Sequence, residues 1–144
     1  MIIIDPGHGA RDSGAVGPSG IKEKDIVLRS SRKIQVLLEH FDYRTRLTRN
    51  DDSYPNWSER VESNKDDLFI SVHCNGAASQ VQGIETLYYS SSSKGKELAS
   101  LIQEELIKST GRKNRGIKSR DNLYVLRKTK SPAVLVEVGF ISNF

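Results

Sequence analysis

The hydrophobic residues of this chain fall into two kinds of pattern that alternate along it. Residues 2–4 ("III"), 68–73 ("LFISVH") and 133–140 ("AVLVEVGF") are short, nearly continuous apolar runs. Such runs are typical of strands that are buried on both faces of a sheet. Residues 43–48 ("YRTRLT") and 83–89 ("GIETLYY") alternate more strongly and predict two further strands.

Most of the remaining apolar residues recur at helical spacing. A stripe with Lys, Arg and Glu between its members predicts an amphipathic helix from Asp25 to about His40, with Asp25 near its N-cap. Asn56 can cap a short helix over residues 57–65. Residues 93–110 predict a second long helix, which the glycine after it can end.

The segment before the last apolar run is less regular. Residues 112–122 ("RKNRGIKSRDN") are expected to form a basic loop, and residues 123–127 ("LYVLR") a further strand. Because strands alternate with helices, the sequence predicts an α/β fold with a mixed, mostly parallel β-sheet flanked by helices on both faces. Ligands of such sheets bind at the carboxyl ends of the strands.

The composition is that of one globular domain. A chain of 144 residues, 36% of them hydrophobic and 28% charged, is long enough to bury a core, so we expect a single domain and a monomer. The lone cysteine, Cys74, has no partner for an internal disulfide. We expect no signal peptide and no membrane insertion, because no apolar run approaches the ~20 residues that span a bilayer.

The net charge of +4 favours an anionic partner, although solubility alone also explains it. Nucleic acid, a membrane surface and an acidic cell-wall polymer all fit this charge. The basic residues lack the interleaved aromatic side chains of a nucleic-acid groove, so nucleic acid is not an expected partner.

Glycines are concentrated in the loop after the first strand, "DPGHGARDSGAVG" from Asp5 to Gly17. A phosphate-binding loop would end on Gly-Lys-Ser/Thr, and a dinucleotide loop would carry Gly-x-Gly-x-x-Gly into a helix; this loop does neither. The glycines instead allow a tight turn that can direct His8 towards a metal. Asp5 is a candidate to orient an imidazole there.

Three apolar strands run into side chains that can bind a metal or transfer a proton. His8 follows the first strand, His73 ends the run at 68–73 with Asn75 two residues later, and Glu137 interrupts the last run. Glu137 stands between two valines, where a carboxylate is costly to bury unless it is paired, protonated or facing a cation. Two histidines with a carboxylate suit Zn²⁺.

The spacing of these residues leaves the ligand set open. Glu23, ahead of the first helix, and Glu85, in the strand at 83–89, compete for the place of third ligand. Glu85 could equally pair with a lysine or an arginine. His8 and His73 could also be structural residues that form hydrogen bonds.

Six blocks of the sequence together resemble one enzyme family. "DPGHGARDSGAVGPSGIKEKD", "RLTRNDD", "ERVESNKDDLFISVHCN", "GIETLYY", "NRGIK" and "YVLRKTKSPAVLVEVGFISN" follow one another as in the zinc-dependent N-acetylmuramoyl-L-alanine amidases of the amidase-3 family, which includes bacterial autolysins and phage endolysins. The resemblance covers residues 3–143. It implies a phosphorylase/hydrolase-like mixed sheet between helices.

The resemblance also implies a reaction and a site. The reaction is hydrolysis of the amide between N-acetylmuramic acid and L-alanine of the peptidoglycan stem peptide, at the cell wall. His8, Glu23 and His73 would hold one Zn²⁺ per chain, and Glu137 would be the catalytic glutamate. Candidate substrate contacts near them are Asn75, Glu85, Arg115 and Lys118, of which Arg115 and Lys118 could instead only keep a loop solvated.

The family continues past "GFISN" into a final helix. The resemblance therefore predicts that residues 1–144 are the catalytic domain without that helix, which a wall-binding domain can accompany in the full-length protein. Two other functions stay open: a zinc deacetylase or peptidase that acts on another cell-wall amide, and a basic wall-binding module without catalytic activity.

Overall fold

The structure is a computed structural model that describes residues 1–78 and 80–143. Its strands are β1 (Ile2–Pro6), β2 (Thr45–Leu47), β3 (Leu68–Asn75), β4 (Ile84–Tyr88), β5 (Asn114–Ser119) and β6 (Ala133–Phe140). Its helices are α1 (Glu23–His40), α2 (Trp57–Arg60), α3 (Ser93–Thr110), α4 (Tyr124–Lys128) and the 3₁₀ helix η1 (Ile141–Asn143).

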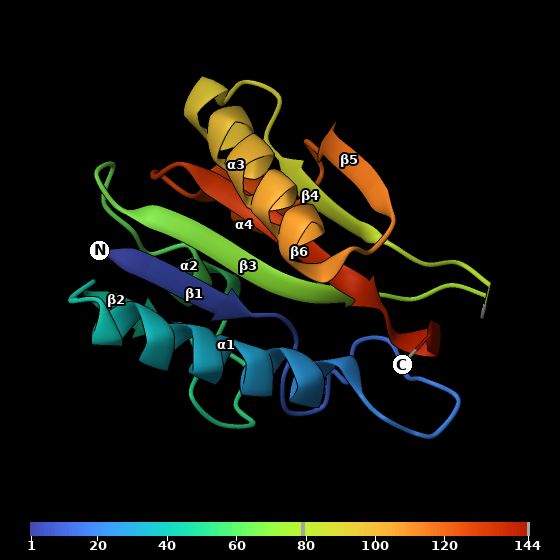
Figure 1. The fold of residues 1–144 in the computed structure, drawn as a ribbon. Coiled ribbons are helices and arrows are strands. Elements are labelled where there is room, and N and C mark those ends of the chain that lie inside the picture. Colours follow the sequence, from blue (N-terminus) through green and yellow to red (C-terminus); the bar gives the residue numbers. More distant parts are fainter. Residues whose placement is uncertain (79, 144) are drawn as a thin grey trace.

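The strands form one sheet in the order β2-β1-β3-β6-β4-β5. Neighbours are parallel except for β4 and β6, which are antiparallel. The predicted mixed, mostly parallel sheet is therefore confirmed. Because β1, β3 and β6 lie side by side and run the same way, their carboxyl ends meet at one edge of the sheet (Figure 1).

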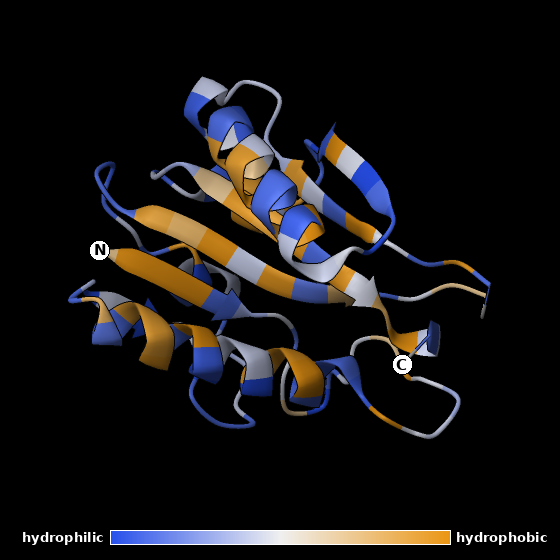
Figure 2. Ribbon diagram, in the orientation of Figure 1, coloured by the Kyte–Doolittle hydropathy of each residue, from blue (hydrophilic) through white to orange (hydrophobic). Residues whose placement is uncertain are grey.

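Helices cover the two faces of the sheet unequally. The long helices α1 and α3 pack on one face, over strand residues such as Val72 and Val134. The short α4 packs on the other face, over Phe69 and Leu135. Figure 2 shows largely apolar strands beneath α1 and α3, in which apolar and hydrophilic residues are interleaved. His73 and Glu137 alternate with residues that pack under α1 and α3, so both lie on the face that carries α4.

Alternation along β3 decides which side chains reach that face. Val72 and Cys74 pack towards α1, so His73 between them projects to the opposite face. Cys74 is the small buried residue that was expected, with 2% of its surface exposed.

Two predictions for residues 112–127 were wrong. Residues 114–119 of the expected basic loop form β5, the edge strand of the sheet, and the expected strand over residues 123–127 is largely the helix α4. β5 was missed because an edge strand with one exposed side needs few apolar residues. In α4, five residues are too few for periodicity to separate a helix from a strand.

Helix boundaries also differ from the prediction. α1 begins at Glu23 with Lys22 as its N-cap, so Asp25 lies within the first turn. Asn56 caps α2 as predicted, but α2 ends at Arg60. In the part of the chain that the structure describes, we find no helix with the length and apolar character to cross a bilayer.

Candidate metal centre

His8, Glu23 and His73 come together from three separate elements. His8 lies in the loop after β1, Glu23 is the first residue of α1, and His73 projects from β3. Glu23 Oε1 lies 3.0 Å from His8 Nε2 and 2.9 Å from His73 Nδ1. Their three ligand atoms lie within 4.8 Å of one another. The structure thus groups the two histidines with Glu23 rather than with Glu85.

The early start of α1 explains why Glu23 reaches this site. Only 4% of Glu23 is exposed, and its Oε1 and Oε2 accept hydrogen bonds from the backbone N–H groups of Cys74 and Ala15, both at 2.9 Å. Burial acts to raise the pKa of Glu23, but hydrogen bonds from His73 and His8 outweigh it and hold that pKa far below its ordinary value. Glu23 is therefore a carboxylate, as a metal ligand must be.

Asp12, which the sequence did not single out, orients His8. Its Oδ2 lies 2.9 Å from His8 Nδ1. A carboxylate can only accept, so Nδ1 donates its hydrogen to Asp12, which leaves Nε2, on the side of Glu23, as the nitrogen that could bind a metal in place of its own hydrogen. Burial lowers the pKa of His8, but the hydrogen bonds to Glu23 and Asp12 outweigh this and raise it. The only trace of this contact in the sequence is the spacing His-x-x-x-Asp, from His8 to Asp12.

Asp5 has a different role from the one predicted. It is 1% exposed and pairs with Arg60 Nη1 at 2.8 Å, while Ser71 and Thr48 each donate a hydroxyl to it at 2.6 Å. Asp5 therefore anchors Arg60 rather than an imidazole.

Two buried arginines hold the loop that carries His8. Arg60 donates to the carbonyl oxygens of Pro6 at 3.0 Å and His8 at 2.6 Å. Arg49 donates to those of Pro6 at 3.1 Å and Gly7 at 2.7 Å. His8 itself has φ 60, a left-handed conformation that a residue with a Cβ adopts only at a cost. The arginines offset this cost and fix the imidazole.

Glu137 lies beside this group on β6. Its position is paired with that of His73 in the register of the parallel strands. Its Oε2 is buried and has no hydrogen-bond partner among the described residues. Burial raises the pKa of Glu137 to about 7, and the nearby Glu23 and Glu85 act in the same direction against His73 and His8. This carboxyl can hold and release a proton near neutral pH.

Glu85 is paired with a lysine and an arginine, the alternative to its being a metal ligand. Lys118 Nζ donates to its Oε2, Arg115 Nε lies 3.4 Å from the same oxygen, and Asn75 Nδ2 donates to Oε1 at 3.0 Å. Glu85 also lies opposite Glu137 in the antiparallel register of β4 and β6. Glu85, Arg115 and Lys118 therefore border Glu137 on the side away from His73, and Asn75 reaches Glu85 from β3.

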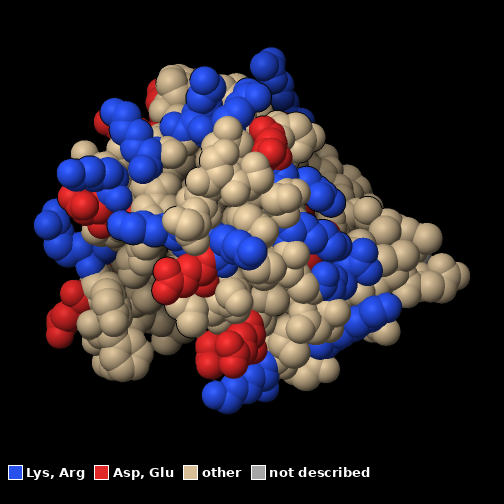
Figure 3. Space-filling view, turned by 90° about the horizontal axis from the view of Figure 1, so that it is seen from above, with Lys and Arg blue, Asp and Glu red and all other residues tan. Residues whose placement is uncertain are grey.

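Arg115 and Lys118 belong to strand β5 rather than to a solvated loop. Both basic side chains converge on the single carboxylate of Glu85, so this border of the site has an excess of positive charge. Figure 3, which looks onto the molecule from the side of α3 and β5, shows many Lys and Arg side chains and fewer Asp and Glu.

The donor set fits zinc. Two imidazole nitrogens and one carboxylate oxygen are a set that catalytic Zn²⁺ sites use, with a further position left for water or substrate. The nearby buried Glu137 oxygen without a partner fits a site where that water binds.

The model of the N-acetylmuramoyl-L-alanine amidase family matches residues 2–144. The chain belongs to this family. The fold, the family and the enzyme class predicted from the sequence are therefore confirmed: by family the chain is an N-acetylmuramoyl-L-alanine amidase, a peptidoglycan hydrolase.

Relatives of known name agree with the family. The chain is 38% identical over 148 residues to the N-acetylmuramoyl-L-alanine amidase LytC of Bacillus subtilis, covering 99% of this chain and 29% of LytC. It is 41% identical over 153 residues to the endolysin of Bacillus phage SPP1, covering 99% of this chain and 55% of the endolysin. The chain thus spans only part of these two relatives.

A solved amidase domain has the same fold. The catalytic domain of CwlV, an N-acetylmuramoyl-L-alanine amidase from Bacillus (Paenibacillus) polymyxa, is 37% identical and superposes with a TM-score of 0.88. That comparison covers 99% of this chain and 81% of the CwlV chain.

Proposed function

We propose that this chain is a zinc hydrolase that cleaves the amide between N-acetylmuramic acid and L-alanine of the stem peptide. His8, Glu23 and His73 would hold one zinc ion per chain. The observation that carries the proposal is their convergence within 4.8 Å, next to the buried Glu137. The printed names of LytC and CwlV support the choice of substrate.

When bound, zinc supplies a water of lowered pKa and polarises the scissile carbonyl. Glu137 takes a proton from the attacking water as its oxygen bonds to the carbonyl carbon. Glu137 then delivers that proton to the alanine nitrogen as the C–N bond breaks. The products are the lactyl carboxylate of the sugar and a free alanine amine. A buried carboxyl beside the proposed metal ligands, with an oxygen that no described residue contacts, suits both steps.

Asn75, Glu85, Arg115 and Lys118 form the peptide side of the proposed site. The stem peptide carries free carboxylates, and the excess positive charge around Glu85 attracts them. Glu85 keeps Arg115 and Lys118 at the border of Glu137, and Asn75 lies between the metal ligand His73 and this pair. The enzyme would act at the cell wall, as a monomer, and its longer relatives leave room for an accompanying wall-binding domain.

The proposal is tested on purified peptidoglycan. We expect release of free N-terminal alanine, loss of this activity with a chelator, and recovery with zinc at one ion per chain. Glu137→Gln should lose activity on the order of 10²–10⁴-fold while still binding one zinc. Glu104→Gln, a change on the exposed face of α3, is the matched control and should be fully active.

Three kinds of result would contradict the proposal. Full activity of Glu137→Gln, or of metal-free protein, would exclude the mechanism. Release of acetate, or of an internal peptide amine in place of alanine, would show a deacetylase or a peptidase. Peptidoglycan binding without any product would show a wall-binding module.

A further inference from the structure

A cavity of about 150 Å³ opens beside the two histidines, on the face of the sheet that carries α2 and α4. His8 and His73 line one end of it. Its floor is apolar and comes from Leu123, Val125 and Leu135. It has room for far more than a single water molecule. The cavity adjoins the metal centre through His8 and His73, and its lining comes from β1, β3, β6, α2, α4 and the loops next to them rather than from β4 or β5.

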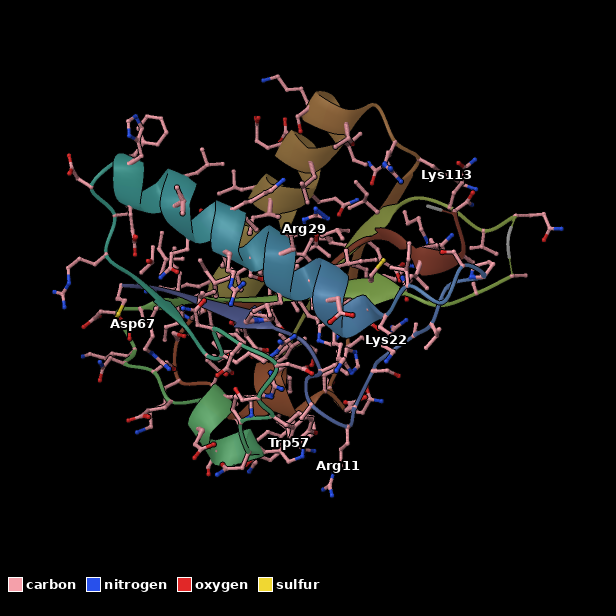
Figure 4. The ribbon with its side chains drawn as sticks, turned by 90° about the horizontal axis from the view of Figure 1, so that it is seen from below. Arg11, Lys22, Arg29, Trp57, Asp67 and Lys113 are labelled. Atoms are coloured by element: carbon pink, nitrogen blue, oxygen red, sulfur yellow. The ribbon has the colours of Figure 1, made fainter. Side chains whose placement is uncertain are left out.

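Aromatic side chains form the rim of this cavity. Trp57 at the start of α2 and Tyr124 at the start of α4 lie with their ring centroids 5.5 Å apart, and Tyr54 stands next to them. Figure 4 shows Trp57 on the side of the sheet away from α1 and α3. Half of the surface of Trp57 is exposed, so part of this side chain is open to a ligand. Such an exposed ring beside a reactive centre is suited to stacking on a ligand.

The charged residues that line the cavity already have partners. Asp5 is bound to Arg60, and Asp12 to His8. Arg60 also donates hydrogen bonds to the carbonyl oxygens of Pro6 and His8. The cavity therefore suits an uncharged ligand with apolar faces. A peptide carboxylate is better placed next to Arg115 and Lys118 on the edge strand β5.

We infer that the cavity between α2 and α4 binds the pyranose ring of N-acetylmuramic acid, stacked on Trp57 and Tyr124. The C–H face of a pyranose is partially positive and the face of an aromatic ring partially negative, so the two attract. This inference rests on the proposed function. It adds the direction of the substrate: sugar towards α2 and α4, scissile amide at the metal, stem peptide towards β5.

The single tryptophan of the chain makes the test direct, because its fluorescence reports on this cavity alone. Zinc-loaded Glu137→Gln protein is titrated with N-acetylmuramic acid and, separately, with the dipeptide L-Ala–D-Glu. We expect a saturable change of Trp57 fluorescence with the sugar and none with the dipeptide. Tyr124→Ala should weaken sugar binding about tenfold. Tyr43→Ala, an exposed tyrosine remote from the cavity, should not.

A kinetic comparison separates the two halves of the substrate. Trp57→Ala should raise KM about tenfold for a muramoyl peptide and leave it unchanged for the same peptide capped with lactate alone. A fluorescence response to the dipeptide but not to the sugar would overturn the inference. No response to either ligand, in protein whose parent cleaves peptidoglycan, would overturn it too. Sugar binding by a chain that releases no alanine would instead refute the proposed function and leave the inference intact.

Discussion

His73 and Glu137 occupy paired positions on the parallel strands β3 and β6. Side chains at paired positions project to the same face of a sheet, so this register alone brings the proposed base next to a proposed ligand. A slip of one residue would turn Glu137 into the core beneath α3, where Val136 and Val134 are packed. The apolar neighbours of Glu137 thus serve to fix its register.

Glu137 is expected to make the stability of the metal-free protein depend on pH. Burial raises the folded-state pKa to about 7 from an ordinary value of 4.5. Between these values the folded chain holds a proton that the unfolded chain has lost, so this residue's contribution to stability falls as pH rises through the window. Metal-free Glu137→Gln should therefore melt at a higher temperature than the parent at pH 8. The difference should vanish by pH 4, and an equal difference at both values would contradict the assignment.

Gly14 is expected to be required for metal binding. A Cβ at this position would lie 2.5 Å from Glu23 Oε2 and 2.6 Å from His8 Cδ2. Gly14→Ala should therefore weaken zinc affinity, measured by competition with a chelator. Gly20→Ala is the matched control, because both glycines have positive φ, 63 and 80, but a Cβ at Gly20 meets nothing within 4 Å.

Both glycine variants should lose about 1 kcal/mol of stability from backbone strain. Gly14→Ala should lose about 1–3 kcal/mol more from the contact itself. Equal zinc affinities in the two variants would show that Gly14 is needed only for its backbone conformation.

Much of the site could be predicted from the sequence because the strands are strongly apolar. The runs that end at His8 and His73 and contain Glu137 identify parallel strands, and the carboxyl ends of parallel strands share an edge. The spacing of the residues could not decide whether Glu23 or Glu85 is the third metal ligand. It depends on where α1 starts and on whether Glu85 finds cations, and those cations come from β5, which has too few apolar residues to be recognised.

Arg60 shows what sequence patterns cannot give. It is 3% exposed, yet a charged residue in a short amphipathic helix is expected at the surface. Its partner Asp5 is 55 residues away along the chain. A buried ion pair between distant segments leaves no periodic signal, so only the fold reveals it.

Lys118 is expected to contribute to binding of the stem peptide. Lys118→Ala should raise KM for a peptide substrate with free carboxylates about two- to fivefold and change kcat little, because the lost interaction is partly exposed. Lys33→Ala, on the exposed surface of α1, changes the net charge equally and should leave KM unchanged. The difference in KM between the two variants should shrink in 0.5 M salt. At this ionic strength the Debye length is roughly 4 Å, so charges on the surface are screened more strongly. Equal effects of both changes would show that only overall charge matters.

The buried pair of Asp5 and Arg60 is expected to be the most sensitive point of the loop that carries His8. Arg60→Met leaves Asp5 with two hydroxyl donors but removes its ion-pair partner, and it takes one donor from the carbonyl oxygen of His8, whereas Arg49 still donates to that of Pro6. The free energy of unfolding, measured with denaturant, should fall by about 3–5 kcal/mol.

A double variant separates the role of Arg60 as a counter-ion of Asp5 from its role as a hydrogen-bond donor to the loop that carries His8. Asp5→Asn combined with Arg60→Met removes both charges and should recover part of the stability, because no unpaired charge remains buried. The double variant should still bind zinc more weakly than the parent, since nothing replaces the donors that Arg60 gives to the backbone at His8. Zinc affinity that recovers fully with stability would mean that Arg60 acts only as a counter-ion, and that the left-handed backbone of His8 is held by Arg49 and the glycines alone.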